Sequence, residues 1–155
     1  MIQNRIKHMR LLSFISLFII CATFVYSCNS TSNSPIVIEN AWIREAPPNA
    51  SAMAGYLKIN NTSDKHIILH SATSPAFKAI EFHRSVEKDG VYRMIPHLHL
   101  HIAANSTFEL KPGDYHLMLF NPVERLQDGD SVTLALKFSD EHIVETTMPV
   151  KKAQY

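Results

Sequence analysis

Residues 131–138 read Ser-Val-Thr-Leu-Ala-Leu-Lys-Phe, and this octapeptide indicates the fold class. Its large apolar side chains recur at every second position, namely at Val132, Leu134, Leu136 and Phe138. Successive side chains of a β-strand point to opposite faces, so the alternation predicts a strand with one buried face. Burying these four side chains should contribute on the order of 6–12 kcal/mol before the loss of chain entropy is subtracted.

The same alternation continues over most of the chain beyond residue 35 and predicts ten strands. They cover residues 36–43, 54–60, 66–72, 79–83, 92–95, 98–102, 107–110, 115–120, 131–138 and 143–150. Turn-forming sequences such as Asp89-Gly90 and Lys111-Pro112-Gly113-Asp114 separate them, and residues 36–150 contain no convincing helical period. The sequence therefore predicts one all-β domain, either a sandwich or a Greek-key barrel.

The first 27 residues have the pattern of a secretory signal peptide. Arg5, Lys7 and Arg10 precede an apolar run, and a small residue, Ser27, stands before the break. The alternative is a permanent transmembrane helix, but the apolar run from Leu11 to Val25 has 15 residues. A membrane span needs about 20. We therefore expect an exported protein.

The residues around Cys28 extend this expectation to a lipid anchor. Val25-Tyr26-Ser27-Cys28 resembles a bacterial lipoprotein signal, in which cleavage leaves a lipid-modified cysteine at the new N-terminus. Residues 28–35 are polar and resemble a flexible tether. The resemblance implies a membrane-anchored lipoprotein on the periplasmic or cell-envelope face. The alternative is cleavage nearby, which would leave a soluble periplasmic product.

Charge and cysteine content exclude several classes of function. The net charge is +1, and residues beyond 27 hold 12 basic and 14 acidic side chains, or about −2. Neither value favours nucleic acid as a partner. The two cysteines are Cys21 and Cys28, so the domain beyond residue 35 has no disulfide, thiolate metal site or cysteine nucleophile. A blue-copper centre, which needs a cysteine ligand, is excluded.

Histidine and methionine are the residues that indicate chemistry. His116-Leu117-Met118 places an imidazole and a thioether on one face of a strand, and this pair of donors favours Cu(I). His83 and Met94 flank the Asp89-Gly90 turn, so a hairpin could present both at one end. No glycine-rich phosphate loop, Gly-x-Ser-x-Gly elbow or His-Glu-x-x-His helix occurs, so we do not expect an enzyme.

The spacing His83, ten residues, Met94, twenty-one residues, His116, one residue, Met118 resembles the signature of the periplasmic copper-A chaperone family, the PCuAC type. Residues 41–44, 89–91 and 109–119 resemble that family too, and the similarity spans about residues 36–150. It implies a cupredoxin-like Greek-key β-sandwich that holds one Cu(I) with those four side chains. It also implies a carrier that delivers copper to the binuclear copper centre of cytochrome oxidase, directly or through another assembly chaperone. Arg84 departs from the pattern, because methionine is frequent there.

A second group of histidines lies outside this resemblance. The segment His97-Leu98-His99-Leu100-His101 predicts one strand with three imidazoles on one face and leucines on the other. These imidazoles either form a solvent-facing surface or bind an auxiliary Cu(II) or Zn(II) ion. We assign His66, His70 and His142 to structural or surface roles.

Two other functions stay open beside the carrier. The first is a lipoprotein that scavenges or buffers copper or zinc with the help of His97, His99 and His101. The second is a metal-free lipoprotein interaction module. The predicted organisation is a signal peptide at 1–27, a tether at 28–35, the copper-binding domain at 36–150 and a tail at 151–155.

Overall fold

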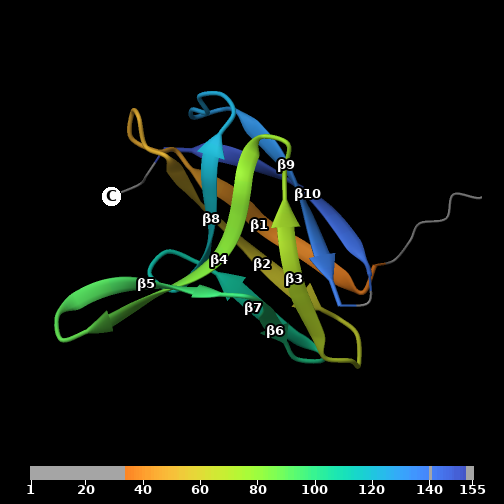
Figure 1. The fold of residues 1–155 in the computed structure, drawn as a ribbon. Helices are drawn as coiled ribbons and strands as arrows, with labels where there is room; N and C mark the ends of the chain where they lie inside the picture. Colours follow the sequence, from red (N-terminus) through yellow and green to blue (C-terminus); the bar gives the residue numbers. More distant parts are fainter. Residues whose placement is uncertain (1–33, 140, 153–155) are drawn as a thin grey trace, which may run out of the picture. The chain divides into compact units, whose positions relative to one another are not determined.

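The computed structural model describes residues 34–139 and 141–152 (Figure 1). Backbone contacts divide the chain into two units, Met1–Asn33 and Ser34–Tyr155. The predicted signal peptide, Cys28 and most of the tether lie outside the described residues. Within the described ranges, no helix has the length and apolar character that crossing a bilayer requires.

The unit from Ser34 onward is built of ten strands, and each of the ten predicted strands is present. Their bounds are β1 Ile36–Arg44, β2 Ala52–Asn61, β3 Ile67–Thr73, β4 Phe77–Lys88, β5 Val91–His97, β6 Leu100–Ile102, β7 Ser106–Leu110, β8 Tyr115–Pro122, β9 Ser131–Phe138 and β10 Ile143–Lys151. The described residues form no helix. The predicted all-β class is confirmed.

The strands are hydrogen-bonded in the order β5-β4-β8-β2-β1-β10-β9-β3-β6, and β7 also pairs with β2. A short parallel pairing of Ile43 with Val150 and Arg44 with Lys151 joins β1 to β10. This series of hydrogen-bonded strands folds back on itself, so that β3 contacts β4 and β6 contacts β7. Figure 1 shows this arrangement, in which strands distant in sequence, such as β2 and β8, lie side by side. This is the layered, Greek-key type of topology that the sequence predicts.

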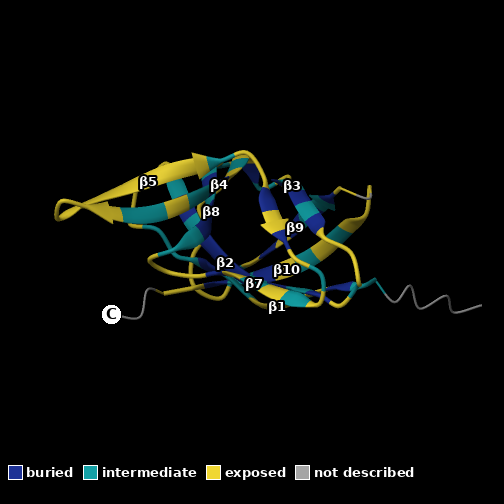
Figure 2. Cartoon of the chain, turned by 90° about the horizontal axis from the view of Figure 1, so that it is seen from below, coloured by how far each residue is buried: buried dark blue, intermediate teal, exposed yellow. Residues whose placement is uncertain are grey.

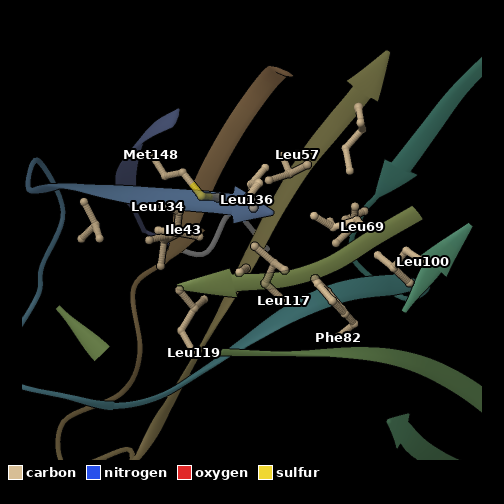
Figure 3. Packing of buried hydrophobic residues seen from close by; sticks show 14 of the residues in the cluster. Ile43, Leu57, Leu69, Phe82, Leu100, Leu117, Leu119, Leu134, Leu136 and Met148 are labelled. Carbon is tan, nitrogen blue, oxygen red and sulfur yellow. The ribbon is translucent and has the colours of Figure 1, made fainter. Parts of the chain in front are cut away.

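The hydrophobic core lies between the facing strands. Leu134, Leu136 and Phe138 of β9 are fully buried, and Val132 is nearly so, which confirms the predicted buried face. Figure 3 shows Leu134 and Leu136 packed with Leu117 and Leu119 of β8 and with Met148 of β10. Every residue of this core cluster lies between Ile36 and Val150. The unit from Ser34 onward thus has its own core and can fold as an independent domain.

A tight turn fixes the hairpin of β4 and β5. Asp89 and Gly90 both have positive φ, 56° and 76°, as a type I′ turn requires. The turn sets a regular register in which Lys88 pairs with Val91, Ser85 with Met94 and His83 with Pro96. Because side chains alternate, His83, Ser85 and Met94 lie on the same face of the sheet.

Candidate metal centre

The pairing of β4 with β8 brings the two predicted histidine ligands together. His83 is directly opposite His116, and Glu81 is directly opposite Met118. All four side chains therefore lie on one face, opposite to the face that buries Phe82 and Leu117 in the core. The imidazole centroids of His83 and His116 are 6.2 Å apart.

Met94 lies at the edge of this group. Met94 is on β5, the strand next to β4, and its Cα partner on β4 is Ser85. Its side chain is therefore on the same face of the sheet as that of His83. Met94 is 59% exposed, and six of the seven residues of β5 are exposed. In Figure 2 the β5 strand is accordingly drawn mainly in yellow. The structure thus clusters His83, His116 and Met118, and it holds Met94 on an open hairpin beside them.

His116 presents one nitrogen without a proton. Its Nδ1 is 2.9 Å from the carbonyl oxygen of Asp114. A carbonyl oxygen can only accept, so Nδ1–H donates this hydrogen bond and the neutral ring keeps its lone pair on Nε2. His116 is 4% exposed, and its Nε2 is buried with no hydrogen-bond partner among the described residues.

His83 is arranged in a complementary way. Its Nε2 is 2.8 Å from Oε2 of Glu81, so Nε2–H donates to the carboxylate. The other ring nitrogen, Nδ1, is buried and has no hydrogen-bond partner among the described residues. A proton there would be a buried donor without an acceptor, which is unfavourable. The neutral tautomer, with a lone pair on Nδ1, fits this site.

Both histidines therefore meet the requirements of metal ligands. In metal centres, a ligating imidazole normally donates its second N–H to a carboxylate or backbone carbonyl, which fixes its orientation and raises its basicity. Glu81 and the Asp114 carbonyl accept such hydrogen bonds from His83 and His116. Residues 34–139 and 141–152 contain no group of three His, Cys, Asp or Glu side chains able to hold a metal. Thioether sulfurs are the other donors on this face of the sheet. Met118 and Met94 are on the correct face to supply them.

Arg84, the departure from the family pattern, does not face this centre. Its neighbour across β8 is Tyr115, and its guanidinium lies 4.8 Å from the Tyr115 ring centroid. Arg84 Nε donates a 2.9 Å hydrogen bond to Oδ1 of Asp114, and this bond raises the pKa of the Arg84 guanidinium. The cation is thus paired with a carboxylate on the other face of the sheet.

The expectation of a single histidine strand is wrong. β5 ends at His97 and pairs with β4, whereas β6 begins at Leu100 and pairs with β3. The chain changes strand partner between them, and Leu98 is 85% exposed rather than buried. His97 consequently lies against Tyr115, with ring centroids 5.1 Å apart.

His66 and His70, which the sequence left without partners, do have partners in the structure. His66 lies against His101, and His70 lies against His99. The sequence alone did not indicate these pairs, because they depend on the antiparallel register of β3 and β6, in which Ile68 is opposite His101. His142 accepts a hydrogen bond at its carbonyl oxygen from the backbone N–H of Phe138.

The fold and the candidate site together define a small β-sandwich with histidine and methionine side chains gathered on one face of the sheet. A family model described as "Putative lipoprotein LpqE-like" matches residues 36–150, and the chain belongs to this LpqE-like family. "Putative lipoprotein Lxx21020" of Leifsonia xyli subsp. xyli is 32% identical over 117 residues, which are 75% of this chain and 69% of that protein. "Uncharacterized protein RP573" of Rickettsia prowazekii is 32% identical over 94 residues. The match covers 58% of this chain and half of the Rickettsia protein.

Solved structures with the same fold include PCuAC domains and the protein DR1885. The copper-bound PCuAC domain from PmoF2 has a TM-score of 0.67 and 19% identity, and the match covers 77% of this chain and 95% of that domain. The solution structure of Cu(I)-bound DR1885 from Deinococcus radiodurans has a TM-score of 0.59 and 26% identity, over 79% of this chain and 83% of that one. The comparisons confirm the predicted cupredoxin-like fold and the resemblance to the PCuAC-type family.

Proposed function

We propose that this protein is an extracytoplasmic Cu(I) carrier that holds one ion with His83, Met94, His116 and Met118. The observation that carries this proposal is the pair of buried nitrogens without a hydrogen-bond partner among the described residues, Nδ1 of His83 and Nε2 of His116, on one sheet face. Two imidazoles and two thioethers form a soft, neutral donor set that suits Cu(I). The copper-bound structural neighbours support the same metal.

The donor set suits transfer rather than storage. None of the four side chains is a thiolate, so an acceptor can displace the ligands one at a time. Met94 lies on an exposed hairpin, where an approaching acceptor can reach it first. We infer that the acceptor is the binuclear copper centre of cytochrome oxidase or another assembly chaperone. The protein would then act as a metallochaperone and not as an enzyme.

The cellular location follows from the N-terminal pattern and the relatives. Residues 1–27 would direct export, Cys28 would carry lipid, and residues 28–35 would tether the domain at 36–150 and its tail at 151–155. The family and the Leifsonia xyli relative both carry the description "Putative lipoprotein", and these descriptions support this anchoring. Attachment to the membrane would raise the concentration of the carrier near membrane-bound acceptors.

The proposal is tested by titrating the domain from Ser34 onward with Cu(I) against a chromophoric Cu(I) chelator. We expect tight one-to-one binding, and X-ray absorption at the copper edge should show two sulfur and two nitrogen neighbours. Failure to compete with the chelator would contradict the carrier and favour the metal-free interaction module. A bound ion with nitrogen and oxygen neighbours alone would contradict the assigned ligands.

Replacing Glu81 with glutamine should weaken Cu(I) binding without removing a ligand. The Glu81 carboxylate accepts the Nε2–H of His83 at 2.8 Å and offsets the positive charge of the ion. Loss of such a partner typically costs about 10- to 100-fold in metal affinity, and we expect roughly tenfold because glutamine still accepts the bond. The same titration measures the effect, and Glu145→Gln, an exposed site on β10, is the matched control. Equal affinities for Glu81→Gln and the wild type would show that Glu81 has no such role.

A further inference from the structure

Four histidines outside the candidate copper site form two pairs where β3 and β6, and the residue before each strand, lie side by side. Nδ1 of His70 is 3.2 Å from Nδ1 of His99, and Nε2 of His66 is 3.2 Å from Nδ1 of His101. The register, with Ile68 opposite His101 and Leu69 opposite Leu100, explains this arrangement. Leu69 and Leu100 point into the core, so the alternating imidazoles point outward from an edge strand and its neighbour.

The spacing of the nitrogens matches a metal chelate. Two histidine nitrogens bound to one tetrahedral ion at about 2.0–2.1 Å lie roughly 3.3 Å apart. Each pair holds its nitrogens at 3.2 Å, where one ring N–H can donate to the other ring. A divalent ion that displaces this shared proton would therefore find both donors already at chelating distance, with little rearrangement of the strands.

The two pairs cannot serve one ion. His66 and His70 are four residues apart, which corresponds to about 13 Å along an extended strand. The described residues also contain no group of three His, Cys, Asp or Glu side chains that could hold a metal. Each pair therefore offers two protein ligands and leaves the other coordination positions to water, which is the arrangement of a weak, exchangeable site.

The His70–His99 pair is accessible to ions from solution. His70 lines an open groove of about 420 Å³ together with Glu81, Pro96 and His97. His99 is exposed, and so are both members of the other pair, His66 and His101. Both histidine–histidine contacts lie at the exposed surface, where a hydrated ion can approach them.

We propose that the His66–His101 and His70–His99 pairs are two separate sites for divalent ions that prefer imidazole, Zn(II) and Cu(II). This inference goes beyond the Cu(I) carrier and does not depend on it, because the two sets of residues do not overlap. It also differs from an auxiliary site along His97, His99 and His101, since His97 lies against Tyr115 instead. The pairs would give the protein a capacity to collect divalent metal at its surface.

Zn(II) is the probe for the test, because it is redox-inert and does not favour thioethers. Isothermal titration of the domain from Ser34 onward should show that His66→Asn and His70→Asn each remove one Zn(II) from the stoichiometry. The double variant should lose two, and each affected site should weaken by roughly tenfold or more once its second imidazole is gone. His97→Asn, the matched control, should keep the wild-type stoichiometry.

Unchanged zinc stoichiometry in the His66→Asn/His70→Asn double variant would exclude both pairs, and loss of zinc in His97→Asn would instead support the arrangement along the chain. Long-range ¹H–¹⁵N spectra of the wild-type imidazoles provide a second measurement that needs no substitution. Zn(II) should shift the ring nitrogens of His66, His70, His99 and His101 together, and absence of these shifts would refute the sites.

Discussion

Replacing both Met94 and Met118 with leucine is expected to lower the Cu(I) affinity by roughly a hundredfold or more, because loss of a direct ligand should exceed the 10- to 100-fold cost of losing an outer-shell partner. Leucine has nearly the volume of methionine but no sulfur, so the change removes donors and leaves packing nearly intact. The two histidines alone would remain, and a pair of imidazoles is a poorer match for a soft cuprous ion.

Competition with a chromophoric Cu(I) chelator measures this effect, and Met148→Leu is the matched control. Met148 is fully buried in the core on β10, and its thioether takes no part in the proposed centre. The control should bind Cu(I) like the wild type. If the double substitution leaves the Cu(I) affinity unchanged, or if Met148→Leu lowers the affinity equally, the two methionines are not ligands of the ion.

Replacing Phe138 with alanine is expected to lower the free energy of unfolding by about 3–5 kcal/mol. Phe138 is fully buried at the end of β9, where it is the Cα partner of Leu69 on β3. Without the ring, the protein loses the free energy gained by burying this side chain. A cavity also remains, and the surrounding strands can close it only in part. β9 pairs with both β10 and β3, so this strand has little freedom to shift.

Urea unfolding followed by circular dichroism measures the loss of stability. Ser131→Ala, at an exposed position on the same strand, should stay within about 0.5 kcal/mol of the wild type. Cu(I) should partly restore the stability of Phe138→Ala, because a ligand that binds only the folded state stabilises it. A loss below about 1 kcal/mol in the variant would mean that the core around β9 repacks freely, contrary to the structure.

Much of the fold was predictable from local patterns. The alternation at Val132, Leu134, Leu136 and Phe138 predicts the buried face of β9, because side-chain direction in a strand depends only on the parity of the position. The Asp89-Gly90 turn predicts the hairpin of β4 and β5, because both residues tolerate positive φ. His116 and Met118 share a face for the same reason of parity, and the motif spacing indicated His83 and Met94 as their companions.

The pairing of strands distant in the sequence could be seen only in the folded chain. The register of β4 against β8 sets His83 opposite His116 and Glu81 opposite Met118. The hydrogen bonds to Glu81 and to the Asp114 carbonyl are local, because each joins a histidine to a residue two positions away in the chain. The change of strand partner after His97 broke the predicted histidine strand and joined its remaining members to His66 and His70. Local alternation determines which way a side chain points, whereas its partner depends on which strands pack together around the shared core. That choice is a property of the whole chain, because it is set by the burial of all ten strands at once.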